Sequence, residues 1–502
     1  MSGSTIPFAQ IPGSLRTPFF FGEVSNVNAN SSPFNQRALL IGQMLSAGSA
    51  TPNIAQVSQG VSDAKSKYGQ GSTLAQMLYS YRQNDSFGEV WCLPLSDAGS
   101  AVAATGTIAF TSANTALGVL SLYIGGLLVS ISLATGQTTT QIATAVAAAI
   151  NAVNDLAVSA TSATGTVTLT AKNLGLLGND IDIRTNYLGT PGGQVTPAGL
   201  AFTITAMSGG LLNPTLTTAL ANLSDMAFDF IACPYNDTTS LNAMQSFLSD
   251  SSGRWSWQSQ IYGGMFFAYR GTYSALGTFG VTRNDQHASC VGIYDSPTPI
   301  WKWAAAQAAQ VAVSVRADPG VPFQTLVLQD VLAPPTQSQF NISERNTLLY
   351  DGISTYTVNS SNQVQIENII TTYQLNGFGQ PDNSYLELNT MYLLMYILRR
   401  QKALLSSKYS RTKLAADGTR FAPGSNIVTP SIIRAELIAD YQQMEYQGYV
   451  QDAESFAAGI IVQQNATNPK RVDVLYPPAL IDQLMIIALL AQFTLQAPVK
   501  TT

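Results

Sequence analysis

Residues 104–209 interrupt the chain with a composition unlike that of either flank. Gly, Ala, Thr and Ser dominate there, and the only charged residues are Asp155, Lys172, Asp180, Asp182 and Arg184. On both sides, short apolar strand patterns alternate with helical ones, which predicts a sheet covered by helices. Insertions are tolerated best in surface loops. We therefore predict one discontinuous α/β domain with a β-rich domain inserted in it.

Local patterns support both parts of this prediction. In the inserted segment, residues 105–110, 121–133, 165–171 and 201–207 alternate like strands, residues 140–153 indicate an alanine-rich helix, and Gly125-Gly126 is a turn signal. In the flanks we expect strands at 37–42, 89–94, 226–233, 265–269 and 288–293. Helices are expected at 72–81, 215–223, 241–248 and 299–315.

The last part of the chain is mixed. Helices are expected at 386–404 and 430–443, and residues 470–476 alternate like a strand that Pro477-Pro478 ends. The apolar run 484–495 is ambiguous by periodicity alone. Because Phe493 and Leu495 alternate with a polar residue, we favour a strand.

Residues 1–35 do not resemble a folded unit. Pro7, Pro12 and Pro18 exclude a helix, while apolar side chains alternate along the segment. Exposed aromatics on a free arm would be a liability, so we expect the arm to lie on protein surface. Whether that surface belongs to the same chain or to another is left open.

Charge excludes several classes of protein. Only 11% of the 502 residues are charged and 46% are hydrophobic, so the surface is expected to be covered largely by other protein. A net charge of -5 argues against nucleic-acid binding. No apolar run approaches the ~20 residues of a membrane span. Residues 1–10 carry no secretory-signal pattern, and three cysteines without a CxxC pair predict reduced, buried thiols.

The usual catalytic and metal-binding patterns are missing, so we predict no enzyme, no cofactor and no metal. His287 is the single histidine, which rules out HExxH, and we find no G-x-S-x-G, Walker A or G-x-G-x-x-G motif. His287 is expected to be a hydrogen-bonded structural residue. Asp180 and Asp182 are a weak calcium signal and more simply a surface turn.

Three further features allow two interpretations each. Glu344-Arg345 is either an ion pair at a domain junction or a solvated pair. Trp255, Trp257, Trp301 and Trp303 favour packing over carbohydrate stacking. The basic residues Arg399, Arg400, Lys402 and Lys408 either stabilise a helix end or face an acidic partner.

Four stretches carry a resemblance to a known family. They are residues 6–22, residues 253–272 with Gly253-Arg254-Trp255-Ser256-Trp257, residues 344–374 beginning Glu344-Arg345-Asn346-Thr347, and residues 471–478. The chain resembles the tail sheath proteins of contractile-tailed, Mu-like phages. The insertion, with Gly178-Asn179-Asp180-Ile181-Asp182, is similar to protruding domains of such sheaths.

The resemblance implies a structural subunit of a phage tail that polymerises into a helical tube around an inner tail tube. Contraction of that tube would drive the inner tube through the host envelope. The implied partners are other copies of the chain, the inner tail tube protein, and baseplate and tail terminator proteins, without nucleic acid or membrane insertion. The implied location is the virion, and the host cytoplasm during assembly. An adhesion protein that binds host glycans through residues 104–210 is the alternative.

Family and sequence together predict an α/β and α+β multidomain chain. We expect an extended arm (1–35), a discontinuous α/β domain (36–103 plus 211–384), an inserted β-rich protruding domain (104–210), a mixed C-terminal domain (385–470) and a C-terminal strand and arm (471–502). Both arms should donate strands to neighbouring subunits. The donating residues would be Ile6, Phe8, Ile11, Leu15, Phe19, Phe20, Phe21, Val472, Val474, Tyr476, Phe493 and Leu495.

Overall fold

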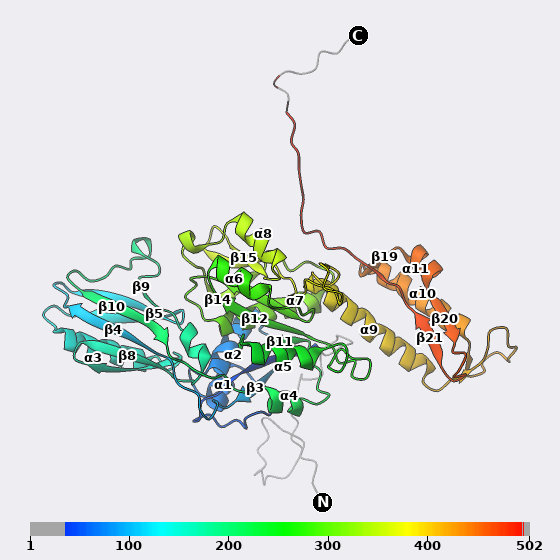
Figure 1. Ribbon diagram of the computed structural model, residues 1–502, viewed down its shortest axis with the longest axis horizontal. Coiled ribbons are helices and arrows are strands. Elements are labelled where there is room, and N and C mark those ends of the chain that lie inside the picture. Colours follow the sequence, from blue (N-terminus) through cyan, green and yellow to red (C-terminus); the bar gives the residue numbers. More distant parts are fainter. Residues whose placement is uncertain (1–35, 494, 496–502) are drawn as a thin grey trace, which may run out of the picture.

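The computed structural model describes residues 36–493 and 495. Three bodies lie in a row (Figure 1). The central body is α/β, the inserted segment forms a β-rich body at one end, and a small C-terminal body lies at the other end of the long helix α9 (Leu388–Tyr409). The protein is therefore a mixed α/β multidomain chain, as the sequence predicts.

A six-stranded sheet forms the centre of the α/β body, in the order β13-β12-β11-β1-β3-β2. All neighbours are parallel except β2 and β3. Most of its residues are buried and apolar, as expected for a parallel sheet covered on both faces. The strands are β1 (Ala38–Gln43), β2 (Gln56–Val57), β3 (Val90–Leu95), β11 (Phe230–Ala232), β12 (Gly264–Arg270) and β13 (Ala288–Ile293).

Helices α2 (Thr73–Asn84) and α7 (Ile300–Ala317) pack against each other beside this sheet. Ser72 caps α2 by accepting a hydrogen bond from the backbone N–H of Ala75. The Trp301 indole donates to Gln76 Oε1 at 2.9 Å, which ties the two helices together. The remaining helices of this part are α1 (Val61–Tyr68), α4 (Thr217–Asn222), α5 (Thr238–Leu248) and α6 (Tyr273–Gly280).

A smaller antiparallel sheet, β14-β16-β15, and helix α8 complete the central body. Their bounds are β14 (Val327–Leu332), β15 (Thr355–Val358), β16 (Gln363–Asn368) and α8 (Ile342–Tyr350). Glu344 and Arg345 do not pair with each other. Glu344 reaches back to the backbone N–H of Asn341 in a capping box, and Arg345 pairs with Glu367 at 2.7 Å. Both interpretations of this pair are therefore wrong.

The inserted body has two sheets, β10-β4-β8-β7 and β6-β5-β9, with α3 (Thr139–Ala152) packed on them. Strands β5 and β6 form a hairpin whose two-residue turn is Gly125-Gly126. Both glycines have positive φ, 55° and 79°, which this tight turn requires. The strands are β4 (Thr105–Ser112), β5 (Gly118–Ile124), β6 (Leu127–Leu133), β7 (Val158–Ala163), β8 (Thr166–Ala171), β9 (Ile183–Thr185) and β10 (Ala201–Ser208).

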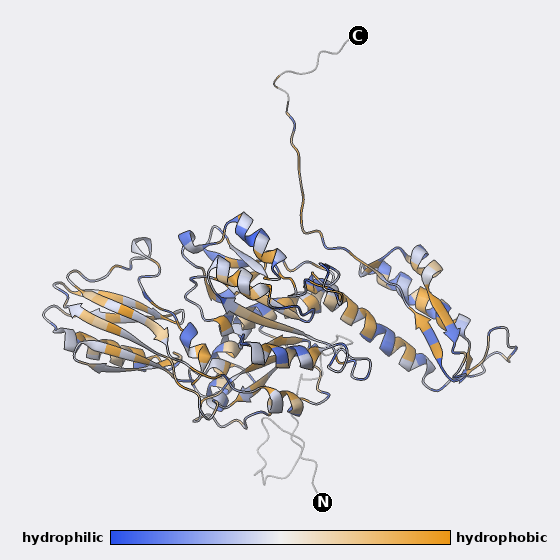
Figure 2. Ribbon diagram, in the orientation of Figure 1, coloured by the Kyte–Doolittle hydropathy of each residue, from blue (hydrophilic) through white to orange (hydrophobic). Residues whose placement is uncertain are grey.

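The C-terminal body has its own hydrophobic cluster, centred on Leu437, Tyr441 and Phe456. In Figure 2 the beginning of α9, which lies against the central body, is mostly apolar, and its later turns alternate with polar residues. The other elements are α10 (Pro430–Tyr446), α11 (Ala453–Gly459), β17 (Lys413–Leu414), β18 (Ile427–Val428), β19 (Val450–Gln451), β20 (Ile461–Gln464), β21 (Val472–Leu475) and β22 (Ala479–Leu480).

Candidate functional site

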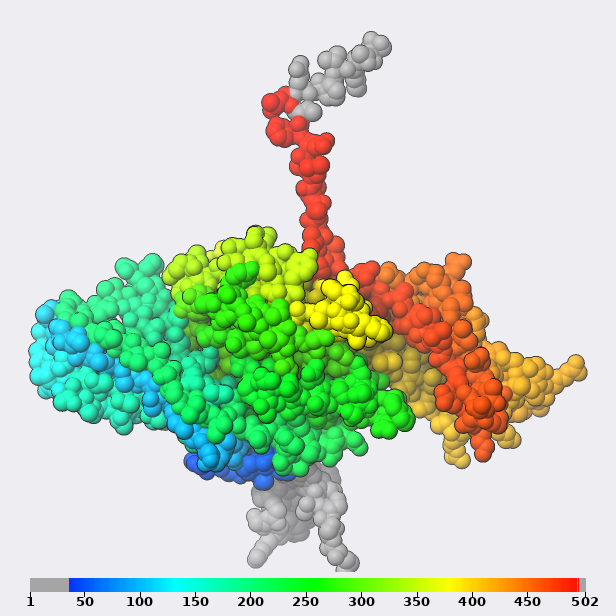
Figure 3. All heavy atoms as spheres, in the orientation of Figure 1, coloured from blue at the N-terminus to red at the C-terminus, as the bar shows by residue number. Residues whose placement is uncertain are grey.

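The C-terminal tail is the most exposed apolar segment of the described chain. Residues 481–493 form neither helix nor strand, and beyond Leu484 they run away from the body as a single extended chain (Figures 1 and 3). Within the described residues no strand lies beside this segment, so the expected strand over 484–495 is not formed inside the single chain, and its pairing with a neighbouring subunit stays a prediction. The exposed side chains are Leu484, Ile486, Ile487, Leu489, Leu490, Phe493 and Leu495.

Strand β21, in contrast, pairs within its own chain. Val472 lies opposite Gln464 and Val474 opposite Val462 in the antiparallel pair β20-β21. Tyr476 packs edge-on against Phe456, which is stacked on Tyr441 at 3.7 Å between ring centroids. Val472 and Val474 thus complete a sheet of their own chain, and their donation to a neighbouring subunit stays a prediction.

Two short antiparallel pairs of the C-terminal body nevertheless keep open edges. Both β20-β21 and β19-β22 are two-stranded within the described residues. Each strand of such a pair has one edge whose N–H and C=O groups lack a ladder partner, and such an edge can accept a further strand. Val474 is 38% exposed, so β21 is accessible.

The predicted donor residues of the N-terminal arm, Ile6, Phe8, Ile11, Leu15, Phe19, Phe20 and Phe21, lie outside the described residues. Their role remains a prediction.

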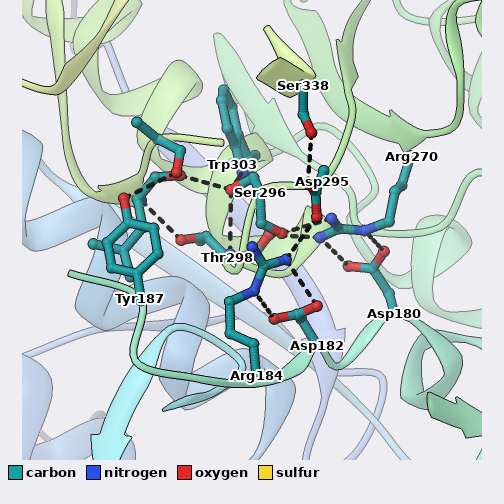
Figure 4. A network of polar contacts seen from close by, with 12 residues as sticks. Asp180, Asp182, Arg184, Tyr187, Arg270, Asp295, Ser296, Thr298, Trp303 and Ser338 are labelled. Atoms are coloured by element: carbon teal, nitrogen blue, oxygen red, sulfur yellow. Dashed lines mark hydrogen bonds and ion pairs between the residues drawn. The ribbon is translucent and has the colours of Figure 1, made fainter. Parts of the chain in front are cut away.

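A buried ion pair joins the inserted body to the central body (Figure 4). Asp180 ends the 3-10 helix Leu176–Asp180 and pairs with Arg270 at the end of β12. Asp180 Oδ2 also accepts from the backbone N–H of Ile300 at 2.7 Å, at the start of α7. Arg270 donates in addition to the carbonyls of Ser296 and Thr298, each at 2.7 Å. Burial alone would lower the pKa of Arg270, but the Asp180 carboxylate outweighs it and raises that pKa.

A second ion pair extends this junction. Arg184 bonds Asp182 at 2.9 Å and Asp295, from the loop after β13, at 3.0 Å. Ser338 donates to the other oxygen of Asp295 at 2.7 Å, and the Tyr187 hydroxyl donates to the Ala333 carbonyl at 2.9 Å. Asp180 and Asp182 are thus neither a plain surface turn nor free to bind calcium. No local pattern indicated Arg270 or Asp295, because the pairs span about a hundred residues of sequence.

His287 is a buried structural residue. Its Nε2 lies 2.9 Å from Asp250 Oδ1, its backbone N–H donates to Asp285 Oδ1, and its ring stacks on Trp255 at 4.5 Å. Of the other tryptophans, Trp301 and Trp303 are buried, whereas Trp257 is exposed. All four lie outside the inserted segment, so they form no glycan platform there.

The basic cluster of α9 is largely neutralised by acids of this chain. Arg399 pairs with Asp229, Arg400 with Asp440 at 2.8 Å, and Lys408 with Glu436. Arg399 and Arg400 are thus engaged with partly or fully buried acids of this chain, whereas Lys408 is 48% exposed in a surface pair.

The described residues show no arrangement typical of catalysis. Within residues 36–493, no three His, Cys, Asp or Glu side chains gather closely enough to hold a metal ion. Burial raises the pKa of Cys92 to about 12, so this thiol stays protonated and is a poor nucleophile. Among the helices of the described part, none is both long and apolar enough to cross a membrane.

Comparisons with known proteins point to one family. Residues 209–372 match the phage tail sheath protein central domain, and residues 380–494 match the phage tail sheath C-terminal domain. Over 493 residues, covering 98% of this chain and 100% of the relative, the sequence is 39% identical to the Mu-like prophage FluMu tail sheath protein of Haemophilus influenzae.

Solved structures with similarity to this chain include two sheath tail proteins. That of Desulfitobacterium hafniense is 12% identical, with 92% of this chain and 97% of that chain covered and a TM-score of 0.48. That of Listeria innocua is 12% identical, with 90% and 93% covered and a TM-score of 0.48. The assignment rests on the family models and the Haemophilus relative.

Proposed function

Because this chain belongs to the phage tail sheath protein family and is a structural subunit of a phage tail, we propose that its exposed C-terminal tail adds a strand to a neighbouring subunit. In this proposal, strand addition links the subunits into a helical tube around the inner tail tube. The links persist while the tube contracts and drives the inner tube through the host envelope. No observation on the described residues favours the alternative of glycan adhesion.

One observation carries the proposal: in the part of the chain that the structure describes, an exposed apolar tail that pairs with no strand occurs together with sheets that have open edges. Leu484, Ile487 and Phe493 are 66%, 79% and 83% exposed. Burying such side chains stabilises a contact by about 25 cal/mol per Å² of apolar area. Each backbone hydrogen bond of an added strand contributes about 1 kcal/mol net. On this side of the chain we propose Phe493 and Leu495 of the tail as donor residues. Val472, Val474 and Tyr476 would take part through the open edge of β21.

The remaining assignments follow from this role. We propose no catalytic step and no cofactor for the subunit. Its partners would be further copies of itself, the inner tail tube, and baseplate and tail terminator proteins. The tail would be assembled in the host cytoplasm, and the subunit would then be part of the virion. Subunits that add strands head to tail without closing a ring form an open helix. The inserted body would protrude from the tube, and the domain boundaries given above remain predictions.

The test is a matched pair of substitutions in the tail. Leu489→Ala removes a side chain, whereas Leu489→Pro also removes a backbone donor and fixes φ. If the tail pairs as a strand, tube formation, measured by electron microscopy and sedimentation, should fall much further with proline than with alanine. Both monomers should melt like the parent, because Leu489 is 88% exposed.

Truncations complete the test. Removal of residues 485–502 should leave a folded monomer that makes no ordered tubes, and so should removal of residues 1–22. Normal polymerisation of either truncated chain would exclude that arm as a donor. Unfolding would show instead that the arm belongs to the core of its own subunit.

A further inference from the structure

Residues 481–484, which we term the root of the tail, lie between the C-terminal body and the central body. Ile481 donates its backbone N–H to the Tyr449 carbonyl at 3.2 Å, which continues the pairing of β22 with β19 in the C-terminal body. Three residues later, the Leu484 carbonyl accepts from Gln324 Nε2 of the central body at 3.1 Å. No described residue beyond Leu484 makes a hydrogen bond to the rest of the chain.

The segment that holds Leu484 is itself well fixed. Residues 319–324, which we term the anchor loop, follow α7. Asn389, in the first turn of α9, donates to the Val321 carbonyl of this loop at 2.8 Å. Phe323 is 2% exposed and packs edge-on against Tyr392 of α9. Gly320 lies so close to the tail root that an added Cβ would be 3.4 Å from Ile481 Cγ2.

We infer that the anchor loop is a positioning element for the donor tail. Gln324 bonds the tail at Leu484 and Gly320 leaves room for Ile481, so that the tail leaves the space between the central and C-terminal bodies in a fixed direction. This inference rests on the strand donation proposed above. A tail fixed at its root samples fewer directions, so less conformational entropy is lost when it pairs with a neighbour. The anchor loop would therefore promote assembly by orienting the tail, and not by contacting the neighbouring subunit itself.

The anchor can be weakened and then restored. Gln324→Ala removes the hydrogen bond to Leu484, and we expect the critical concentration for tube formation to rise roughly fivefold, the effect of one net hydrogen bond. The pair Gly320→Cys/Ile481→Cys has side chains close enough for a disulfide. The native Cys92, Cys233 and Cys290 are fully buried, so mild oxidation should act on the new pair alone.

The decisive test uses the full-length chain with Gln324→Ala, Gly320→Cys and Ile481→Cys combined. After oxidation, the cross-link should return the critical concentration to the parent value, and reduction should raise it again, while the melting temperature of the Gln324→Ala chain stays near the parent value. Each single cysteine variant should show no redox effect. A merely structural role of Gln324 would change the melting temperature and would not be rescued by the cross-link.

Two results would overturn the inference. One is an unchanged critical concentration for Gln324→Ala while truncation of residues 485–502 abolishes tubes, which would leave the strand donation intact but remove the anchor. The other is an oxidised Gly320→Cys/Ile481→Cys chain, otherwise unaltered, that fails to assemble until reduced, because the root would then have to be released. If the truncated chain assembles normally, the proposed strand donation itself fails.

Discussion

Arg399 and Arg400 are consecutive residues of α9, yet their guanidinium groups pair with acids in different bodies. Arg399 pairs with Asp229, which directly precedes β11 of the central sheet and is fully buried, and it also donates to the Ile261 carbonyl at 2.9 Å. Arg400 pairs with Asp440 of α10 in the C-terminal body. Because successive helical residues point about 100° apart, α9 can contact both the central body and the C-terminal body at this position.

The first prediction concerns the ion pair between Arg399 and Asp229. Arg399→Met should destabilise the chain by about 3 kcal/mol, because it leaves the buried Asp229 carboxylate without its partner. The double variant Arg399→Met/Asp229→Asn, which removes both charges, should recover most of the loss. Denaturant unfolding measures both. Arg400→Met is the matched control, with a smaller effect, since its ion pair is more exposed. Equal losses for the single and double variants would contradict the prediction.

The inserted body should be dispensable for folding of the rest. Val102 and Leu211 form an antiparallel bridge at its base, with backbone hydrogen bonds in both directions. A short Gly/Ser linker in place of residues 104–209 should therefore leave a folded chain that still forms tubes.

That deletion leaves Arg270, which still donates to the Ser296 and Thr298 carbonyls, without the Asp180 carboxylate, so it should cost stability that Arg270→Gln partly restores. Calorimetry of the deleted chain with and without this substitution measures the effect. A deleted chain that cannot fold would show that the insertion belongs to the core.

His287→Gln should leave tube assembly and phage infectivity nearly unchanged. The ring is buried between Trp255 and Asp250, and a glutamine amide can also donate to the Asp250 carboxylate. We expect a loss of about 1 kcal/mol in unfolding free energy, typical of a weakened hydrogen bond. Lost infectivity with normally assembled tails would argue for a role beyond structure.

Stability should fall at acidic pH through Asp85. Burial alone would raise the pKa of this carboxyl, but Arg316, the backbone N–H of Gly88 and the Tyr81 hydroxyl together hold it below its ordinary value of 3.8. Since the pKa is lower in the folded than in the unfolded chain, the stabilisation is complete above about pH 4 and is lost as the pH falls through the folded-state pKa.

Asp85→Asn should therefore destabilise the protein at pH 7 by about 1–3 kcal/mol and progressively less at pH values below about 4. Urea unfolding of both proteins at several pH values gives the difference, in which contributions of the other carboxyls cancel. A difference that is independent of pH would contradict the assignment.

Local patterns in the sequence determined most of the elements. Predominantly apolar residues in β1 and β13 indicate strands buried on both faces, Ser72 marks the start of α2, and Gly125-Gly126 marks the turn between β5 and β6. These signals act over a few residues, through side-chain periodicity, capping hydrogen bonds and backbone φ, so the sequence alone contains them. The compositional break around the insertion also needs no structure to be seen.

Only the tertiary structure decided which residues that are distant in sequence lie next to each other. Asp180 meets Arg270 and Asp229 meets Arg399 across 90 and 170 residues of sequence, and no local pattern encodes such a pairing. The same limit explains the end of the chain. The apolar character of residues 484–495 is plain from the sequence, and so is that of β21. Strand β21 pairs with β20 of its own chain, whereas no strand of the described part lies beside the tail. A strand exists only where a partner edge lies in reach, because its hydrogen bonds are made between strands and not within one.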